Sequence, residues 1–543
     1  MKAAWLDQRT GWPGAVFELL EERIPGGARW AYVFGSALVF LLLAQLASGL
    51  GLALSYSASV PAAWASVARL EESHLGHLLR AVHAHGATFL LAVVSLHLLQ
   101  TALSGACRAP REVTWWLGLL LLVLLLAFCI TGSLLPWDER GYWATRVTVG
   151  IAASVSPSVA RALVGGAALG NLTLTRFYAL HAVLLPLLLL VFAAAHVAGV
   201  RRHGITPPPN AAGDEPFWPR QALYDAAFSL LLLAALLALA LRVPAPLLAP
   251  ADPAGAASPR PDWYFRPLFQ LLKLVPEWVA TLLVPSLAAL FLAALPFLDK
   301  PARRRLPLML ALTGGFVAAI ALGAASYRAD ARSPDFQREL REGDRRAALA
   351  RDLARRQGVP PEGALSLVQN QPDARGKRLF ARACAECHGL ADSAKAPVLE
   401  GGFLSRAWIR GALEHPDAPA YYGRTKLSGM ESASGLGEEQ LALLTGFLYA
   451  LRSHASTEPA LESGRRLYQQ SGCADCHALD GAAPAGGPTL AGYGSAGWLR
   501  GLLRDPGAAA YYDAQNAMPD FGTRLGAGDL DDLVAYLVSL EGT

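Results

Sequence analysis

The chain has 543 residues, 53% of which are hydrophobic, and its mean hydropathy of +0.32 lies above that of ordinary soluble proteins. This length allows several domains, and nearly all of the apolar excess falls before residue 328. The formal net charge of +4 is small and the basic residues gather at the ends of apolar runs, which argues against a nucleic-acid partner and favours a membrane protein.

Seven apolar runs are long enough to cross a membrane, since a helical span needs about 20 residues. They cover approximately 31–54, 84–104, 114–135, 178–200, 222–243, 276–298 and 306–326. The first run follows a polar stretch that lacks the pattern of a cleavable signal peptide. We expect residues 1–29 to form a cytoplasmic amphipathic segment.

Clusters of Lys and Arg at the ends of the runs predict the orientation of the spans. They comprise Arg23 and Arg29, Arg108 and Arg111, Arg201 and Arg202, and Lys300, Arg303, Arg304 and Arg305. With seven spans all four clusters fall on one side of the membrane, which the positive-inside rule makes the cytoplasmic side. The portion after residue 327 is then periplasmic, and we expect the chain in a bacterial inner membrane.

Four histidines lie in the second and fourth runs, where ionisable side chains are costly and mark function by default. The separations are 97 − 83 = 14 residues for His83 and His97, and 196 − 181 = 15 for His181 and His196. Four helical turns take about 14.4 residues, so each pair occupies one helix face. A lone histidine also fits hydrogen-bonded packing, but two matched pairs predict two stacked b-type haems. His83 then pairs with His181 near the outer surface, and His97 pairs with His196 near the cytoplasm; His85 is expected to be only a neighbour of the haem pocket.

Glycines in the first and third runs repeat the same spacing. Gly35 and Gly49, and Gly118 and Gly132, are each 14 residues apart. Glycine allows a macrocycle to approach a helix backbone closely, which agrees with two stacked haems. Small-residue packing between helices is the alternative explanation.

Residues 1–327 resemble the cytochrome b of quinol-oxidising bc complexes, and in particular the chloroplast-type cytochrome b joined to its subunit IV. The motifs that carry the resemblance are Arg80-Ala-Val-His83, Thr131-Gly-Ser-Leu-Leu-Pro-Trp-Asp138, Gly141-Tyr-Trp143 and Thr173-Leu-Thr-Arg-Phe-Tyr-Ala-Leu-His181. The 15-residue histidine spacing is the pattern of this subtype. The resemblance implies a four-helix domain over 30–215 that holds two haems, and a three-helix domain over 216–327.

The resemblance also implies that Arg80 and Arg176 neutralise haem propionates. Chloroplast-type subunits attach an extra haem through a cysteine near the start of the first span, but Val33 stands there. We therefore expect no thioether-bound haem at the inner site. The inner quinone site is poorly specified: Asp225, Arg201 and His203 offer protonatable groups, and each is also consistent with a cytoplasmic surface residue.

The loop over 244–275 contains Pro261-Asp262-Trp263-Tyr264, which resembles the Pro-Glu-Trp-Tyr motif of the outer quinol-oxidation site. A carboxylate at the edge of an apolar pocket accepts a proton that quinol releases and passes it to water. Asp262 holds the position of the family's glutamate with a side chain one methylene shorter. The quinol is expected between this loop and the 141–145 region, which includes Tyr142. A proline-capped loop with an interfacial aromatic anchor is the structural alternative.

The residues after the last run contain a duplicated pattern. Residues 328–370 are rich in charged residues and are expected to form a solvated, partly helical linker. Two units follow, 371–455 and 456–543, whose matching cysteines are 473 − 384 = 89 residues apart. The first unit carries Cys384-Ala-Glu-Cys387-His388, and the second carries Cys473-Ala-Asp-Cys476-His477. This motif gives two thioether bonds and one axial imidazole to a c-type haem. Two copies predict two covalent haems rather than zinc, which would need further cysteine or histidine ligands.

The second axial ligands follow from the scarcity of methionine. Met430 lies 430 − 388 = 42 residues after the first haem histidine, and Met518 lies 518 − 477 = 41 residues after the second. Thioether ligation raises the haem potential, which suits an electron acceptor. A loop methionine that packs on the ring is the alternative, and His415 and His454 are competing ligands. Both units resemble class I cytochrome c.

The sequence thus predicts an all-α protein: a seven-helix transmembrane cytochrome b bundle followed by two soluble cytochrome c domains. The resemblance implies that quinol is oxidised on the outer side, one electron passing through a separate Rieske iron–sulfur protein to the c haems and the other inward through the b haems to quinone. A downstream periplasmic cytochrome or oxidase and a homodimer are expected partners. Alternatives are the haem-bearing membrane anchor of a dehydrogenase, and an electron conduit to a terminal oxidase without quinol chemistry.

Overall fold

The computed structural model describes residues 20–207, 213–255, 260–299, 305–389, 394–427, 429–453, 461–480, 487–512 and 516–542, with eight residues before them. The chain divides into two compact units, Met1–Leu367 and Val368–Thr543, and each is considered by itself. Lys300, Arg303, Arg304 and His454, which the sequence analysis singled out, lie outside the described residues.

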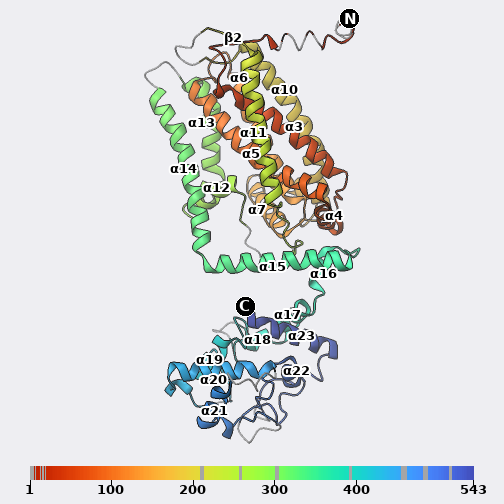
Figure 1. The fold of residues 1–543 in the computed structure, drawn as a ribbon, viewed down its shortest axis with the longest axis vertical. Helices are drawn as coiled ribbons and strands as arrows, with labels where there is room; N and C mark the ends of the chain where they lie inside the picture. The colour runs from red at the N-terminus through yellow and green to blue at the C-terminus, as the bar shows by residue number, and fades with distance from the viewer. Residues whose placement is uncertain are drawn as a thin grey trace. The chain divides into compact units, whose positions relative to one another are not determined.

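Seven helices of the first unit are long and apolar enough to cross a membrane, counted over the described residues (Figure 1). They are η1–α3 (Trp30–Ala53), α5 (His74–Ser104), α6 (Glu112–Leu134), α9–η2–α10 (Asn171–His203), η3–α11 (Phe217–Arg242), η5–α13 (Val279–Leu298) and α14 (Arg305–Arg332). The all-α prediction is confirmed, since the described strands are only β1 (Arg23–Ile24) and β2 (Glu215–Pro216), which pair with each other.

Local chemistry explains where the histidine-bearing helices begin and bend. Ser73 caps α5 by accepting a hydrogen bond from the Gly76 amide (3.0 Å), and Gly105, with a φ of 74°, ends it. The fourth span contains a π-helical turn, η2 (Leu180–Leu184), immediately before Pro186 in α10 (Leu185–His203). Proline has no amide hydrogen for the helical ladder, and a widened turn accommodates that loss. His181 lies in this turn.

Helices α3 and α5 pack together, as do α6 and α10. Their shared core is almost entirely aliphatic, with Leu41, Leu90, Leu124 and Leu189 buried. Short helices close one end of the bundle: α4 (Val60–Glu72), α7 (Glu139–Val155), α8 (Pro157–Val164), η4 (Trp263–Phe265) and α12 (Arg266–Leu271).

The basic clusters used to predict orientation meet at the other end of the bundle. Arg108 forms an ion pair with Asp299 (2.7 Å), and Arg305 lies 3.7 Å from the same carboxylate. Arg111 donates to the His203 carbonyl (2.9 Å). These contacts join loops that are distant in sequence, so the described members of three clusters share one end of the bundle.

The segment expected to be a solvated, partly helical linker contains a helix that is docked on the first unit. α15 (Pro334–Gln357) runs across the end of the bundle at a steep angle to α14 (Figure 1). Ser333 caps it by accepting from the Phe336 amide (3.3 Å), and Arg351 donates to the Leu247 carbonyl (2.6 Å). Its helical character agrees with the expectation, but its docking does not follow from its high charge: the apolar positions follow a helical period, and Ala347, Ala350 and Leu353 are buried.

The second unit is also helical. Its main helices are α17 (Pro372–Ala383), α18 (Ala385–His388), α19 (Arg406–Glu414), α20 (Glu438–Ala450), α21 (Glu462–Gln470), α22 (Ala496–Arg504) and α23 (Ala527–Ser539). The repeats are visible in matched contacts. The Trp408 indole donates to the Val398 carbonyl (3.1 Å), and the Trp498 indole donates to the Thr489 carbonyl (2.9 Å).

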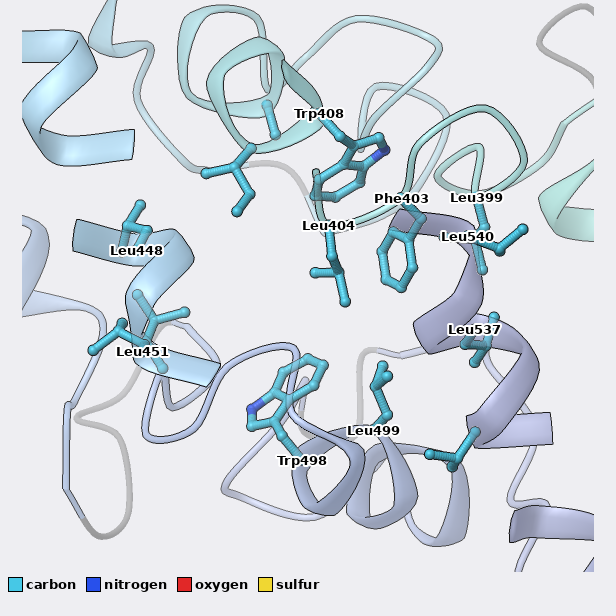
Figure 2. Close-up of a cluster of buried hydrophobic side chains, with 14 of the residues drawn as sticks. Leu399, Phe403, Leu404, Trp408, Leu448, Leu451, Trp498, Leu499, Leu537 and Leu540 are labelled. Carbon is cyan, nitrogen blue, oxygen red and sulfur yellow. The ribbon is translucent and has the colours of Figure 1, made fainter. Parts of the chain in front are cut away.

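The two repeats exchange helices and share one core. α17 of the first repeat packs on α23 of the second, while α21 of the second packs on α20 of the first. The rings of Phe380 and Tyr536 lie 5.3 Å apart, and those of Phe447 and Tyr468 lie 5.8 Å apart. Side chains of both repeats line the same buried cluster (Figure 2). The segments 371–455 and 456–543 are therefore interlocked rather than independently cored.

Candidate functional site

The outer histidines come together as the spacing predicted. The His83 and His181 rings have centroids 6.2 Å apart with an interplanar angle of 71°. Two imidazoles on one metal, with metal–nitrogen bonds of about 2 Å each, place their ring centres roughly 6 Å apart. The pair therefore fits a shared metal centre such as a haem iron. His97 and His196, which follow His83 and His181 by 14 and 15 residues on the same two spans, are close enough to interact electrostatically.

Hydrogen bonds fix which nitrogen of each outer histidine is free. Ser48 uses its hydroxyl hydrogen for the Ala44 carbonyl (2.8 Å), so its Oγ accepts from Nδ1 of His83 (3.1 Å). Thr131 donates to the Ala127 carbonyl (2.8 Å) and likewise accepts from Nδ1 of His181 (3.1 Å). With Nδ1 protonated, Nε2 presents its lone pair, which is the state that ligates a metal.

The inner histidines differ from each other. His196 donates from Nδ1 to the Thr114 carbonyl (2.9 Å), which again frees Nε2. The Nδ1 atom of His97 is buried without a hydrogen-bond partner among the described residues.

Three of the four spaced glycines face these rings. A Cβ atom on Gly49 would lie 3.0 Å from Cε1 of His83, and one on Gly132 would lie 2.6 Å from Cε1 of His181. On Gly118 it would lie 3.2 Å from Cε1 of His196, whereas Gly35 has open space within 4 Å. The glycines at 49, 118 and 132 thus admit the imidazoles themselves. A role of Gly35 beside a macrocycle stays a prediction.

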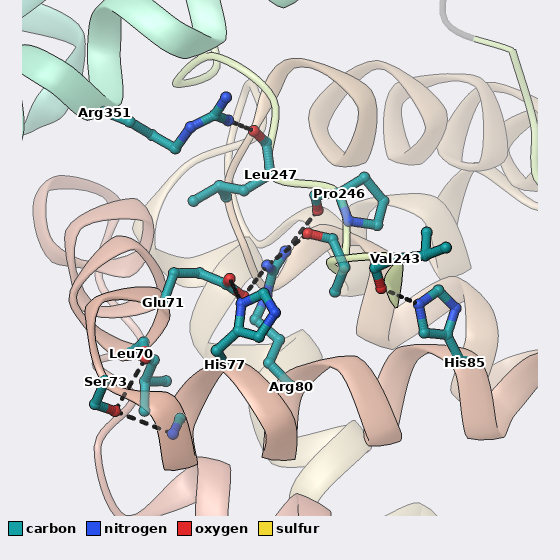
Figure 3. A network of polar contacts seen from close by, with 12 residues as sticks. Leu70, Glu71, Ser73, His77, Arg80, His85, Val243, Pro246, Leu247 and Arg351 are labelled. Carbon is teal, nitrogen blue, oxygen red and sulfur yellow. Dashed lines mark hydrogen bonds and ion pairs between the residues drawn. The ribbon is translucent and has the colours of Figure 1, made fainter. Parts of the chain in front are cut away.

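Arg80 lies in a polar network that the sequence analysis missed (Figure 3). It is buried, pairs with Glu71 (2.5 Å) and donates to the Ala245 carbonyl (2.9 Å). Glu71 also accepts from Nδ1 of His77 (2.6 Å). The sequence feature that could have indicated this network is the presence of Glu71 and His77 within nine residues of Arg80. Arg176 donates to the Ala162 carbonyl and is exposed; propionate binding by either arginine stays a prediction.

The four-residue loop motif forms a small polar cluster. The Tyr264 hydroxyl donates to Asp262 (3.1 Å), and the guanidinium of Arg140 lies 3.6 Å from the other carboxylate oxygen. The Asp262 side chain is 41% exposed, so it has access to water. Trp263 is exposed and Pro261 is half-buried, its carbonyl accepting from Arg266 (3.1 Å).

Tyr264 connects this cluster to the histidine pair. It interacts with Cys129 of α6, and the ring of the preceding residue, Phe128, lies 5.3 Å from that of His181. Burial raises the pKa of Tyr264 well above its usual value, and the neighbouring Cys129 and Asp262 raise it further. The phenol therefore stays protonated and remains a hydrogen-bond donor.

The opposite side of the cluster is the start of α7. Tyr142 is buried, with its ring edge-on to Trp137 (5.6 Å) and to Trp143 (5.5 Å). Asp138 caps the helix by accepting from the Gly141 amide (2.9 Å) and also accepts from the Leu248 amide (3.1 Å). Burial raises the pKa of Glu139, and the Arg346 charge partly opposes that shift. Arg140, absent from the sequence-based candidates, links this helix start to Asp262.

In the second unit, each attachment histidine is oriented by a backbone carbonyl. His388 donates from Nδ1 to the Pro397 carbonyl (2.7 Å), and His477 donates to the Pro488 carbonyl (2.9 Å). Both therefore offer Nε2, as an axial haem ligand requires. Cys384 is buried, which raises the pKa of its thiol to about 11, whereas Cys387 is exposed.

The second attachment segment shares these features. Cys473 is partly buried and Cys476 is exposed, as in the first. An added Cβ at Gly487 would lie 2.6 Å from Cε1 of His477, so only glycine fits against that ring. Met518 packs against the shared core, while Met430 is 42% exposed. Ligation by either methionine stays a prediction, as does the competing role of His415.

At the end of the bundle with the basic clusters, Asp225 is buried rather than on the surface. It accepts from the Ser36 hydroxyl (2.6 Å) and from the Gln221 amide (2.8 Å). Arg201 lies 3.4 Å from Glu22 and is half exposed. The three inner-site candidates thus have different surroundings, and only Asp225 has lost contact with solvent.

Family comparisons agree with these two units. A model described as Cytochrome b(N-terminal)/b6/petB matches residues 88–250, and one described as Cytochrome b(C-terminal)/b6/petD matches residues 250–326. A Cytochrome c model matches residues 374–452, and a Cytochrome C oxidase, cbb3-type, subunit III model matches residues 459–537. The protein is therefore a multi-pass membrane cytochrome b fused to cytochrome c domains, with haem cofactors and a role in electron transfer.

Individual relatives place the membrane portion more closely. Cytochrome b6 of Tupiella akineta is 34% identical over 208 residues, which are 38% of this chain and 97% of that protein. Cytochrome b6 of Synechococcus sp. (strain JA-3-3Ab) is 37% identical over 209 residues, again 97% of that protein. A solved structure titled Hyperthermophilic respiratory Complex III has a TM-score of 0.55 and 26% identity, covering 64% of this chain and 95% of that one. The chain belongs to the cytochrome b6 family, and the resemblance found in the sequence is confirmed.

Proposed function

We propose that the chain is the cytochrome b and dihaem cytochrome c subunit of a quinol:cytochrome c oxidoreductase. The observation that carries this proposal is the cluster of Asp262, Tyr264 and Arg140 next to the His83–His181 pair. It combines a carboxylate that is 41% exposed with a phenol that stays protonated. The phenol interacts with Cys129, and the ring of the preceding residue, Phe128, lies 5.3 Å from that of His181. This is the equipment for taking a proton from a quinol while its electrons leave nearby.

Two non-covalent b-type and two covalent c-type haems, when bound, supply the one-electron redox chemistry. We assign the b sites to the pairs His83–His181 and His97–His196, with Nε2 as the ligand atom. The c sites are assigned to Cys384, Cys387, His388 and Met430, and to Cys473, Cys476, His477 and Met518. The hydrogen bonds at Nδ1 of five of these histidines support the assignment.

The residues of the chain bind, orient and deprotonate the quinol. Tyr264 holds Asp262 in place through its hydroxyl (3.1 Å), and the guanidinium of Arg140 lies 3.6 Å from the other carboxylate oxygen. Trp263, Pro261 and the buried Tyr142 supply apolar surface that excludes water from the bound ring. Because Asp262 is partly exposed, the proton it accepts can pass to the outer water.

The proposal includes partners and a location. A separate Rieske iron–sulfur protein takes the first electron and delivers it to the c domains, since no Rieske motif occurs in this sequence. A periplasmic cytochrome or oxidase accepts electrons from the c domains, and the complex is a homodimer. The chain lies in a bacterial inner membrane with its basic loops in the cytoplasm and its c domains outside.

The test is quinol-driven reduction of the c haems in the purified complex, with and without the Rieske protein. We expect reduction only when the Rieske protein is present. The Asp262→Ala variant should slow it at least about tenfold, because a positioned base contributes roughly 10²–10⁴-fold. Glu277→Ala, which removes an exposed carboxylate beyond the same loop, is the matched control and should leave the rate unchanged. Equal rates without the Rieske protein would overturn the proposal.

A further inference from the structure

A buried ion cluster lies where α14 ends, outside the groups assigned above. Asp330 is 5% exposed and accepts from Nε of Arg260 (3.0 Å) and from the guanidinium of Arg266, which is 8% exposed. Ser326, fully buried on the same helix, accepts from Arg266 as well (3.3 Å). Burying one carboxylate between two guanidinium groups is costly unless the geometry is well satisfied, and here both carboxylate oxygens are used.

The two arginines bracket the loop motif. Arg260 directly precedes Pro261, and Arg266 directly follows Phe265, so one carboxylate of α14 holds both ends of the segment that contains Asp262. Arg266 also donates to the Pro261 carbonyl (3.1 Å), which closes the loop on itself. Aromatic rings cover both cations: Arg266 lies 4.5 Å from the Tyr327 ring centre, and Arg260 lies 4.3 Å from that of Phe336.

The chain continues from α14 into α15, which contacts the start of α7 on the other side of the Asp262 cluster. Arg346 pairs with Glu139 (3.2 Å), the first residue of α7, and with Glu342 on its own helix (2.9 Å). Arg351 donates to the Leu247 carbonyl (2.6 Å), in the same loop whose Ala245 and Pro246 carbonyls accept from Arg80 (Figure 3). Glu139 is followed by Arg140, whose guanidinium lies 3.6 Å from Asp262.

We propose that the segment 330–351 is a positioning strap for the quinol-oxidation site. It fixes the loop with Asp262 through Asp330, and it fixes the start of α7 with Arg140 and Tyr142 through Arg346. The two walls of the site are thereby held at a set separation by one continuous piece of chain. The strap residues touch neither quinol nor haem and act through Arg260, Arg266 and Glu139. This inference rests on the proposed quinol oxidation.

The test uses the purified complex with its Rieske partner and compares Asp330→Asn and Arg346→Gln with wild type. A displacement of about 1 Å at a reacting site costs up to roughly 100-fold, so we expect KM for a short-chain quinol to rise about tenfold or more. The dissociation constant of a chromone-type inhibitor of the outer site, measured by calorimetry, should rise by a similar factor. Asp335→Asn removes an exposed charge one turn into the strap and should change neither value.

The outcomes separate the strap from the function. Spectra of the b and c haems first establish that each variant is assembled. Arg346 is less buried than Asp330, its side chain being 33% exposed, so Arg346→Gln is the deciding variant if Asp330→Asn does not assemble. Wild-type KM and inhibitor affinity in an assembled Arg346→Gln or Asp330→Asn variant would overturn the strap while leaving the proposed function intact. Wild-type protein that neither oxidises quinol nor binds the inhibitor would instead overturn the function on which the strap rests.

Discussion

Each outer histidine is framed by a hydroxyl residue and the glycine that follows it on a neighbouring helix. Ser48 and Gly49 of α3 frame His83, and Thr131 and Gly132 of α6 frame His181. The hydroxyl oxygen holds Nδ1, and the missing Cβ leaves room for Cε1. Each helix thus supplies the same pair of contacts, one at Nδ1 and one at Cε1, so both rings are oriented in the same way relative to the helix that frames them.

The closest of these contacts gives a prediction. In Gly132→Ala the new Cβ would lie 2.6 Å from Cε1 of His181, so the ring must move. Overpacking of this kind costs about 1–3 kcal/mol, and we expect weakened retention of the outer b haem. Gly314→Ala, in a membrane helix with nothing within 4 Å of the added carbon, is the control. A pyridine haemochrome assay would count b haem in both; equal counts after purification would show that the contact is not needed.

At the scale of elements, the exchange of helices between the c repeats is the main departure from expectation. An added Cβ at Gly376 of α17 would lie 1.9 Å from the Asp532 carbonyl oxygen of α23. At Gly464 of α21 it would lie 2.6 Å from Cβ of Phe447 in α20. Neither helix crossing has room for a Cβ atom, and each joins one repeat to the other.

This arrangement predicts a loss that crosses repeats. Gly376→Val should destabilise the c unit by about 3 kcal/mol or more, because the clash is with backbone that cannot move aside. Since α23 follows the second attachment segment, both c haems should be affected, not only the first. Gly528→Ala, on α23 with open space around it, serves as the control. Peptide-resolved hydrogen exchange around the two attachment segments measures this, and a loss of protection confined to the peptides around Cys384 and Cys387 would contradict the exchange.

The sequence predicts the spans and the histidine pairs well because both depend on local period and composition. A run such as 114–135 has only one stable placement in a bilayer, and a 14- or 15-residue spacing sets one helix face. The exchange of α17 and α21 was not predictable, since the two repeats carry the same pattern of helices and each helix therefore has a similar partner in either repeat. The Asp330 cluster was missed because its arginines are 60 or more residues away in sequence. Arg140 was missed for the same reason, since its partner Asp262 is far from it in the sequence.

In the whole chain, a membrane cytochrome b and a pair of interlocked c domains belong to one polypeptide. α14 and α15, near the end of the first unit, contact both walls of the proposed site: Asp330 of α14 binds the arginines that flank the Asp262 loop, and Arg346 of α15 binds Glu139 at the start of α7. The residues at the end of the membrane portion therefore position the two walls of the proposed quinol-oxidation site.

The most direct test of the central claim is a single-turnover experiment on the oxidised complex with its Rieske partner. Quinol is mixed with it while the inner quinone site is blocked, and b and c absorbance bands are followed together. Bifurcated oxidation predicts that b and c haems are reduced in parallel and in equal initial amounts, and that both signals vanish when the Rieske protein is omitted. Reduction of the b haems alone, at an unchanged rate without the Rieske protein, would contradict the account.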